Sequence, residues 1–275
     1  MQTISIYLQE TLPERFLIGL ELEGVRYILG TLGVFITIWV LLAPLLEQRR
    51  IREPMNDKRL VGQIKKELLN SLRTICIFIA LDIIVFDLAE VGIFKTYSNI
   101  EQYGWLWFYC SIPLAIILHD TYFYWAHRAM HHKKLFRVFH LTHHRSNNPT
   151  PFTAYSFAFG EAIVMYAYIP ILMLIIPMHV FAITVILLVM IFKNAIGHCG
   201  YELFPKNTLN IPFLRLNTTV THHDMHHEKA NGNYGFYFTW WDKWMGTEHI
   251  DYQNRFLLAV ASQPTNETEE LKSCG

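Results

Sequence analysis

Long hydrophobic blocks without charged residues are the most prominent feature of this chain. One such block covers residues 27–46 and another covers residues 163–192. In a bilayer only a helix or a closed barrel satisfies its own backbone hydrogen bonds, and about 20 apolar residues are needed for one helical crossing. We therefore predict membrane-spanning helices, of which the first covers residues 25–46. A soluble protein that buries these blocks in its core is the alternative, and the length of the blocks disfavours it.

Two further spans are predicted between these blocks. Residues 72–91 are apolar except for Asp82, Asp87 and Glu90, and acids inside a membrane usually face a protein interior. Residues 105–125 carry tryptophan and tyrosine at both ends, as is typical of a helix that ends at the two membrane interfaces.

The last block is too long for one crossing. As a continuous helix, residues 163–192 would be about 45 Å long, against roughly 30 Å of hydrocarbon. Pro170 and Pro177 lie near its middle, where proline breaks or kinks a helix. Two short helices that enter and leave on the same side are one prediction, and a single strongly tilted span is the other.

Local charge orients the spans. Residues 47–67 contain seven Lys or Arg against four acids, and residues 126–160 contain five Lys or Arg and no acid. Basic loops stay in the cytoplasm, so both stretches are predicted there and the chain starts on the outer side. Residues 1–24 are predicted to be an amphipathic or loose segment without a cleavable signal, so the first block remains as an anchor. The net charge is zero, which gives no reason to expect nucleic acid as a partner.

These patterns predict an all-α fold, namely a multi-pass membrane helical bundle with a cytoplasmic helical cap. We expect an N-terminal membrane anchor region of two spans (1–104), a second domain (105–255) and a disordered tail (256–275), whose polar sequence starts at Ser262. The four cysteines are scattered without a CxxC motif, so neither a disulfide framework nor a zinc ribbon is indicated.

Ten of the fourteen histidines fall in two short windows, HRAMHHKKLFRVFHLTHH (127–144) and HHDMHH (222–227). Residues three or four apart share one face of a helix, so His127 and His131 are able to grip one ion. The trios at 140, 143 and 144 and at 223, 226 and 227 have the spacing i, i+3, i+4, and each is expected to direct three neutral nitrogens to a common point. Eight such nitrogens exceed the four ligands of a closed zinc site and suit two ions with open positions. Ligand type alone does not name the metal, since imidazole binds iron, zinc, copper and nickel.

The segments HRAMH, HLTHH and HDMHH resemble the three histidine boxes of the sterol desaturase and fatty acid hydroxylase superfamily, a group of membrane non-haem di-iron oxygenases. The flanking sequences HDTYFYWAHRAMH, GHCGYELFP and NGNYGFYFTWWDKWMGT strengthen the resemblance, which covers about residues 110–250. The chain is most similar to sterol-type members, including sterol methyl oxidases and their bacterial relatives. For residues 105–255 the resemblance implies a catalytic domain of this type.

The resemblance implies two iron ions as the cofactor, which zinc is able to replace in a structure. His198, from the GHCGYE segment, is an implied ligand, and His222 is a further candidate beside its neighbour. The remaining implied ligands are the box histidines: His127, His131, His140, His143, His144, His223, His226 and His227. We expect the other four histidines, which are His119, His132, His179 and His249, to lie outside the metal set.

A histidine that binds a metal usually donates its second N–H to a carboxylate or a carbonyl. Asp120, Glu202, Asp224 and Asp242 are the candidates for this supporting role. Asp120 and Glu202 each lie one or two helical turns from a predicted ligand. For Asp242, a turn or salt-bridge role within TWWDKWMGT is an equal alternative.

A shared metal site also decides between the two topologies. The third box is able to meet the first two only if residues 163–192 return to the same side, so a hairpin is expected, with all boxes on the cytoplasmic side. The resemblance implies O2-dependent hydroxylation or desaturation at a C–H bond of a lipid or sterol-like substrate. Phe152 and Tyr155, in an aromatic-rich loop, are expected to line the entrance for this substrate. The sequence has no nucleotide, haem or iron–sulfur motif, so an external electron donor of the cytochrome or ferredoxin type is expected.

Two other classes of protein remain as alternatives. A histidine-rich membrane metal-binding or transport protein without oxygenase activity would place its ligands within the spans or in loose tracts, whereas these ligands keep helical spacing. A structural zinc scaffold would need only four closed ligands for each ion. Consumption of oxygen on addition of a reductant separates the enzyme from both.

Overall fold

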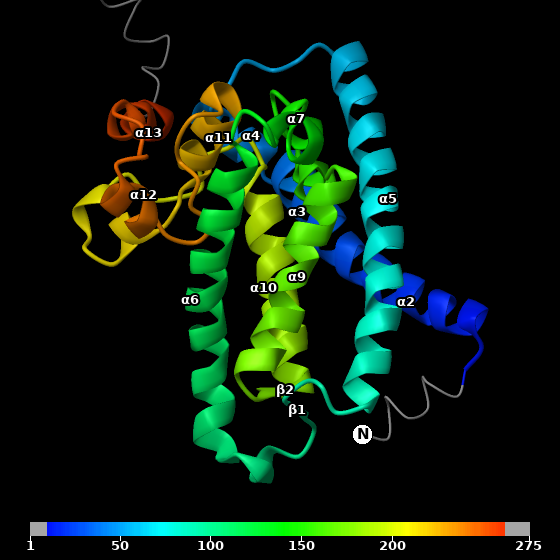
Figure 1. Cartoon of the computed structure of the whole chain (residues 1–275). Helices are drawn as coiled ribbons and strands as arrows, with labels where there is room; N and C mark the ends of the chain where they lie inside the picture. Colours follow the sequence, from blue (N-terminus) through cyan, green and yellow to red (C-terminus); the bar gives the residue numbers. More distant parts are fainter. Residues whose placement is uncertain (1–9, 262–275) are drawn as a thin grey trace, which may run out of the picture.

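The computed structural model describes residues 10–261, and nearly all of its regular structure is helical (Figure 1). Two strands of two residues each, β1 (Thr96–Tyr97) and β2 (Met178–His179), pair in parallel. The α-helices are α2 (Leu12–Tyr27), α3 (Gly33–Phe35), α4 (Ala43–Leu46), α5 (Asp57–Glu90), α6 (Gly104–Met130), α7 (Phe136–Phe139), α8 (Leu141–His144), α9 (Phe159–Ile175), α10 (Val180–Gly197), α11 (Val220–Lys229), α12 (Trp240–Met245) and α13 (Tyr252–Val260).

The first helical stretch begins much earlier than the sequence pattern predicted. It starts at Leu12 rather than at residue 25, because Thr11 and Glu14 cap it: the Thr11 N–H donates to the Glu14 carboxylate at 2.7 Å. Helical turns then continue through α3 to α4. Within α2, Leu17 and Leu22 are exposed while Glu23 is buried beside Arg26. The amphipathic character expected of residues 1–24 is therefore present in a helix rather than in a loose segment, and residues 1–9 lie outside the described part.

The block at 163–192 forms two helices, and the single tilted span is excluded. Helix α9 ends at Ile175 and α10 begins at Val180, with Pro177 in the turn between them. Pro170 lies inside α9 and does not end it. The two helices run antiparallel between α6 and α5, and the turn that joins them meets β1 at the far end of the molecule (Figure 1).

By length and hydropathy, two helical stretches among residues 10–261 qualify as membrane spans. These are residues 12–41, with a mean hydropathy of 1.7, and α10, with a mean hydropathy of 2.3. Helix α9 is apolar but shorter. The spans predicted at 72–91 and 105–125 fall within the long helices α5 and α6, and their crossing of a membrane stays a prediction.

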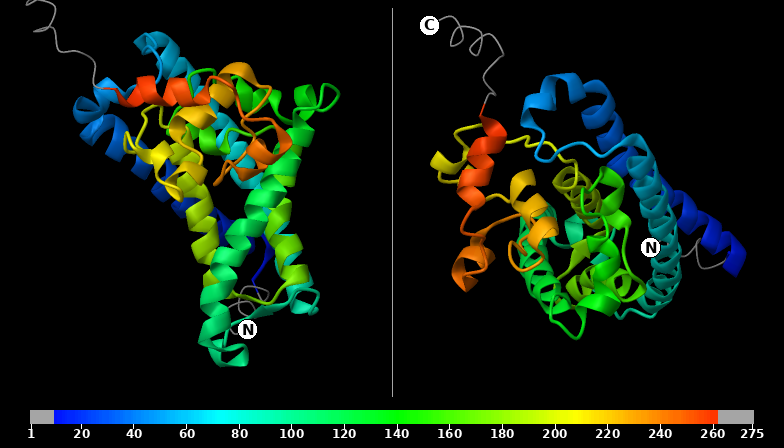
Figure 2. Two further views of the ribbon diagram at one scale, coloured as in Figure 1. Left: turned by 90° about the vertical axis from the view of Figure 1, so that its left-hand side faces the viewer. Right: turned by 90° about the horizontal axis from the view of Figure 1, so that it is seen from above.

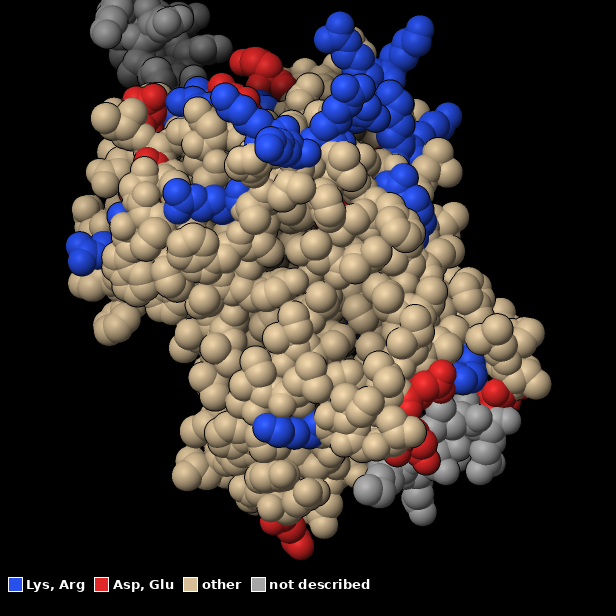
Figure 3. Space-filling model, viewed as in Figure 1, with Lys and Arg blue, Asp and Glu red and all other residues tan. Residues whose placement is uncertain are grey.

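The short helices gather at one end of the long ones. Figures 1 and 2 show α7, α8, α11, α12 and α13 at the end where α6 finishes and where α10 finishes. Most Lys and Arg side chains visible in Figure 3 lie at this same end, above a wide belt that carries almost no charge. Helix α13 runs across the predicted tail boundary at residue 256, and Phe256 is buried against Met225 of α11. The predicted tail from Ser262 lies outside the described residues.

Candidate metal centre

Four segments that are far apart in the sequence deliver the histidines to one place. The C-terminal end of α6 carries His127 and His131, and the last turn of α10 leads into His198. Helix α8 and the residue before it supply the second box, and α11 supplies the third. All of these ends lie within the cluster of short helices, because the α9–α10 hairpin returns the chain to the end from which it left (Figure 1).

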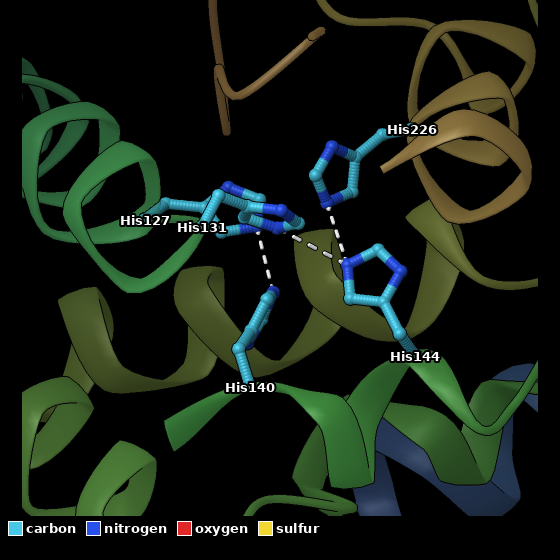
Figure 4. A group of neighbouring side chains, drawn as sticks. All are labelled: His127, His131, His140, His144 and His226. Atoms are coloured by element: carbon cyan, nitrogen blue, oxygen red, sulfur yellow. Dashed lines mark hydrogen bonds between the residues drawn. The ribbon is translucent and has the colours of Figure 1, made fainter. Parts of the chain in front are cut away.

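Nine histidines form two groups, each able to hold a metal ion. Within each group the ligand nitrogens all lie within 4.8 Å of one another. The first group, drawn in Figure 4, consists of His127, His131, His140, His144 and His226. The second group consists of His143, His198, His223 and His227.

Each histidine trio is divided between the two groups, which corrects the expectation that a trio points to one ion. His143 belongs to the second group, while its neighbour His144 belongs to the first. Likewise His226 belongs to the first group and His227 to the second. Consecutive residues on a helix point about 100° apart, so adjacent histidines reach opposite sides. Helices α8 and α11 thus lie between the two groups and contribute to both.

Hydrogen bonds at Nδ1 fix how several of these rings are turned. The Nδ1 of His127 contacts the Tyr234 carbonyl oxygen at 2.9 Å, and that of His226 contacts the Gly232 carbonyl oxygen at 2.7 Å. The Nδ1 of His198 contacts the Asn194 carbonyl oxygen at 2.7 Å. A carbonyl oxygen only accepts, so each Nδ1 must carry the proton, and the Nε2 of each neutral ring is left with a bare lone pair.

The Nε2 atoms of the grouped rings point at one another, and in each of the closest pairs one of them is bare. The Nε2 atoms of His144 and His226 are 3.0 Å apart in the first group, and those of His198 and His227 are 3.0 Å apart in the second (Figure 4 for the first). The Nε2 of His198 also lies 3.0 Å from that of His223. The bare Nε2 of His198 lies close to three other ring nitrogens, and one lone pair cannot bind a proton from all three. A cation bound between the rings is held by all of these nitrogens at once, so the residues fit a metal ion.

The rings are also neutral, as metal binding requires. Burial lowers the pKa of His144 to about 3, and burial lowers the pKa of His198 to about 4. For His227 burial is again the main cause, and the neighbouring histidines His143 and His144 lower its pKa further. At neutral pH these nitrogens are therefore free to act as ligands without first losing a proton.

His222 lies outside both groups, so the tenth ligand suggested by the sequence is not present in the constellation. Its ring is buried, and its Nε2 lies 3.7 Å from an oxygen of Asp242. It precedes His223 on α11, where consecutive side chains point about 100° apart, and its ring packs against Tyr252 rather than the grouped histidines. The remaining histidines, which are His119, His132, His179 and His249, also lie outside both groups, as expected.

Asp120 and Glu202 hold loops rather than histidines, which corrects their expected role. Asp120 accepts the backbone N–H groups of Tyr237 and Phe238, at 2.7 and 3.2 Å. Glu202 accepts the N–H of Thr221 at 2.8 Å, within the first turn of α11. Both carboxylates therefore position the third box from a distance, by fixing the backbone on either side of it.

Asp224 and Asp242 have similar positioning contacts. Asp224 forms a 2.7 Å ion pair with Arg52, which ties α11 to the stretch before α5. Asp242 accepts the N–H groups of Tyr234 and Gly235, both at 2.8 Å, so the turn role weighed for it is the one it has. Among the described residues, none of the four predicted acids bonds to a histidine of either group.

The carboxylate that does support a ligand is Glu161, which the sequence analysis missed. Its Oε1 accepts the Nδ1–H of His140 at 2.7 Å, and both side chains are buried. The sequence held a signal, because Glu161 is the only acid between Asp120 and Glu202 and it stands at the start of an apolar block. An acid in that position is usually functional.

Phe152 and Tyr155 do not line an open entrance. Both are buried in a hydrophobic cluster with Tyr27 and Phe78, where the rings of Phe78 and Tyr155 pack edge to face at 5.3 Å. Phe157, two residues further on, lies against His143 with ring centroids 5.7 Å apart. The aromatic loop therefore forms a packed wall that connects α2 and α5 to the second histidine group.

Comparison with known proteins identifies relatives for the part of the chain that carries the site. A family model described as fatty acid hydroxylase matches residues 112–247. A Delta(7)-sterol 5(6)-desaturase of Gibberella zeae is 31% identical over 189 residues, which is 68% of this chain and 57% of that protein. A methylsterol monooxygenase of Aspergillus fumigatus is 33% identical over 144 residues, covering 50% of this chain and 48% of that protein. Methylsterol monooxygenase 1 of Rattus norvegicus is 32% identical over 133 residues, covering 48% and 44%.

The chain thus spans roughly half the length of these curated relatives. No solved structure matches it. The matched region contains all nine grouped histidines and Glu161.

Proposed function

Because the chain belongs to the sterol desaturase and fatty acid hydroxylase superfamily, we propose that it is a membrane-bound di-iron oxygenase that oxidises a C–H bond of a lipid or sterol-like substrate with O2. The observation that carries the proposal is the convergence of nine neutral imidazoles into two adjacent groups with bare nitrogens facing inward. Zinc or another divalent ion would fit these nitrogens as well, so the choice of iron rests on the family.

The first group would hold one iron ion through its five histidines and the second group would hold the other through four. When bound, the metal pair supplies the activation of O2 and the oxidising power for an unactivated C–H bond. The protein holds the ligands in position: the carbonyls of Tyr234, Gly232 and Asn194 set the rings, and Glu161 fixes His140.

The overall reaction needs electrons from outside the chain. Hydroxylation consumes one O2, two electrons and two protons, and yields an alcohol and one water. Desaturation consumes the same reactants, removes two hydrogen atoms from the lipid and yields an alkene and two waters. A cytochrome or ferredoxin type of donor fits this need, since the described histidine site includes no other redox group.

We place the histidine groups on the cytoplasmic side of a multi-pass bundle, in a cap formed by α7, α8 and α11–α13. The gathering of Lys and Arg side chains at this end supports that orientation under the positive-inside rule (Figure 3). The uncharged belt below it, together with α10 and the helical stretch at 12–41, supports a membrane location for the rest.

The test is to purify the protein from cells grown with iron and to count the metal. We expect about two iron ions for each chain, a Mössbauer signature of a coupled iron pair, and O2 consumption when a reductant and membrane lipids are added. Lipids from cells that express the protein under ¹⁸O2 should contain one new hydroxyl or double bond, and an inactive ligand variant should lack it. A metal-loaded protein that binds and releases metal but never consumes O2 would instead be a metal-binding or transport protein.

A further inference from the structure

A ledge projects sideways from the metal-binding end of the molecule. It consists of residues 205–216 and helix α12, and Figures 1 and 2 show it overhanging the upper part of α6 and α10. The two parts of the ledge are joined by hydrogen bonds, among them that from the Thr239 N–H to the Leu216 carbonyl oxygen at 2.7 Å. The ledge is therefore a tied unit that extends beyond the long helices on one side.

Large apolar side chains of the ledge are exposed. Phe213 is 83% exposed and Trp244 is 65% exposed, and the Trp244 ring stacks on that of Trp240 at 6.0 Å. Lys243 lies between these tryptophans in the chain, and its Nζ donates to the Arg215 carbonyl oxygen. Tryptophan next to Lys and Arg is the composition of a membrane interface. In Figure 3 the face of the molecule below this overhang carries almost no charge, so a lipid leaflet fits beneath the ledge.

A crevice lies between α10 and the two segments that continue the chain from the ledge. It is lined by Lys193 of α10, by Thr218, which follows residues 205–216, and by Phe236, which precedes α12, and His223 of the second group also borders it. Its free volume of about 10 Å³ is room for a single water molecule. A lipid can therefore pass only when a wall moves. Thr218 and Phe236 both lie outside the helices, and Phe236 has the larger side chain of the two.

Lys193 is the charged residue in the otherwise apolar sequence of α10. Its Nζ donates to the Thr218 carbonyl oxygen at 2.7 Å, and both residues line the crevice, so the ammonium group lies at its wall. An ionisable residue within an apolar helix is costly and usually functional. An ammonium group at this position is suited to an oxygen atom at the polar end of a lipid.

We propose that the lipid substrate enters from the bilayer beneath the ledge and reaches the second histidine group through this crevice. Phe236 is the gate, and Lys193 binds the oxygen-bearing polar end of the substrate, so the oxidised C–H lies close to that end. That the entering lipid is a substrate rests on the proposed function, whereas the entry route itself depends only on the fold.

The larger cleft of the molecule is a poor route for an apolar chain. It measures about 950 Å³ and is lined by polar and cationic side chains, including Arg59, Lys66 and Arg145. No histidine of either group lines it. In the labelling experiment below, labels in this cleft are compared with labels in the crevice.

The route is tested by photo-crosslinking, which needs no turnover. The full chain in nanodiscs of phosphatidylcholine is illuminated with a long-chain alcohol that carries a diazirine two or three carbons from its hydroxyl, and the labelled peptides are mapped by mass spectrometry. We expect labels on residues 193–197, 213–219 and 236. Labels confined to the cleft residues 58–73 and 142–148 would overturn the route, and so would labels spread evenly over the apolar belt.

Two glycines provide a matched pair of variants. A side chain at Gly197 points into the crevice, where its Cβ would lie 3.6 Å from the His223 ring, whereas a Cβ at Gly62 in the larger cleft would have nothing within 4 Å. Gly197→Val should lower labelling of residues 213–219 and 236 about tenfold, and Gly62→Val should leave it unchanged. Equal labelling in both variants contradicts the proposal.

Two further variants separate the gate from the polar contact and keep the test valid if Gly197→Val fails to fold. Phe236→Ala should raise labelling inside the crevice severalfold. Lys193→Met should lower labelling by the alcohol about fivefold, but not labelling by a hydrocarbon of the same length without the hydroxyl. Loss of labelling by both probes would contradict the role of Lys193. Crevice labelling in a protein that never consumes O2 would retain the route and reject the proposed function.

Discussion

The two histidine groups differ in how many of their rings are held by hydrogen bonds and in whether they border the crevice. In the first group, three of the five rings are held at Nδ1, His127 and His226 by backbone carbonyls and His140 by Glu161. In the second group, one of the four rings, His198, is held in this way, by the Asn194 carbonyl. The Nδ1 atoms of His143 and His227, like that of His144 in the first group, have no hydrogen-bond partner among the described residues. The second group also has fewer ligands and borders the crevice at His223.

This difference indicates a division of labour. A five-ligand site with fixed rings leaves little room for another molecule, while a four-ligand site with freer rings retains an open position. The second group is thus the one where O2 and substrate are expected to meet the metal, and the first is expected to act as the anchored partner. Three predictions test this comparison.

The largest effect is expected from removing one ligand in each group. His198→Ala leaves three histidines in the second group, and the three short Nε2 contacts of His198 place it at the centre of that group. We expect the metal content to fall from about two to about one ion for each chain, with loss of turnover. His131→Ala leaves four histidines in the first group and should retain about two ions. Metal is counted by mass spectrometry of the purified protein, and an equal loss in both variants would remove the distinction between the groups.

The next effect is on the stability of the metal-free protein in acid, and here the two groups should behave alike. Burial lowers the pKa of His144 in the first group to about 3 and that of His198 in the second to about 4. Each histidine has a pKa near 6.5 when the chain is unfolded. Below that pH the unfolded chain binds more protons than the folded chain, so stability falls as the pH drops from about 6.5 towards about 4.

Each such histidine contributes up to about 1.4 kcal/mol for each pH unit in this window. Thermal unfolding of the metal-free protein in detergent should therefore shift to lower temperature between pH 7.5 and pH 5. His144→Gln and His198→Gln should each flatten this dependence by a similar amount. A midpoint that does not change with pH would mean that the rings are not buried as neutral groups.

The grouped histidines were readable from the sequence because their spacing is local. The i, i+3, i+4 pattern requires only that the segment is helical, and all nine grouped histidines were identified in this way or through the resemblance. The hairpin at 163–192 was also readable, because its length and prolines left two solutions and the need to bring all the histidines to one side decided between them.

The distribution of ligands between two groups was not readable. His143 and His144 reach different groups because α8 lies between them, and the position of α8 is set by packing that no local pattern encodes. The contacts that hold the rings were not predictable from the sequence either. The carbonyl groups of Tyr234, Gly232 and Asn194 belong to the backbone, so the identity of those residues gives no signal. Asp120 and Glu202, which were chosen by helical spacing, hold loops instead, since a side chain one or two turns away is not necessarily turned towards its neighbour.

The smallest of the three effects concerns Glu161, which stiffens the first group. Glu161→Gln keeps the shape of the side chain but replaces a carboxyl oxygen that accepts the His140 Nδ1–H with an amide group, which is a weaker acceptor. Loss of such a supporting contact costs about 10–100-fold in metal affinity. Glu67→Gln is the matched control, because Glu67 is equally buried but bonds to Thr150 and Thr153, away from the histidines. Compared with the unmodified protein, Glu161→Gln should release metal to a chelator faster, whereas Glu67→Gln should release it more slowly or at the same rate. In Glu161→Gln the faster phase should account for one of the two ions. If both ions were released faster, Glu161 would stabilise the whole centre rather than its anchored half, and the division between the groups would have to be abandoned.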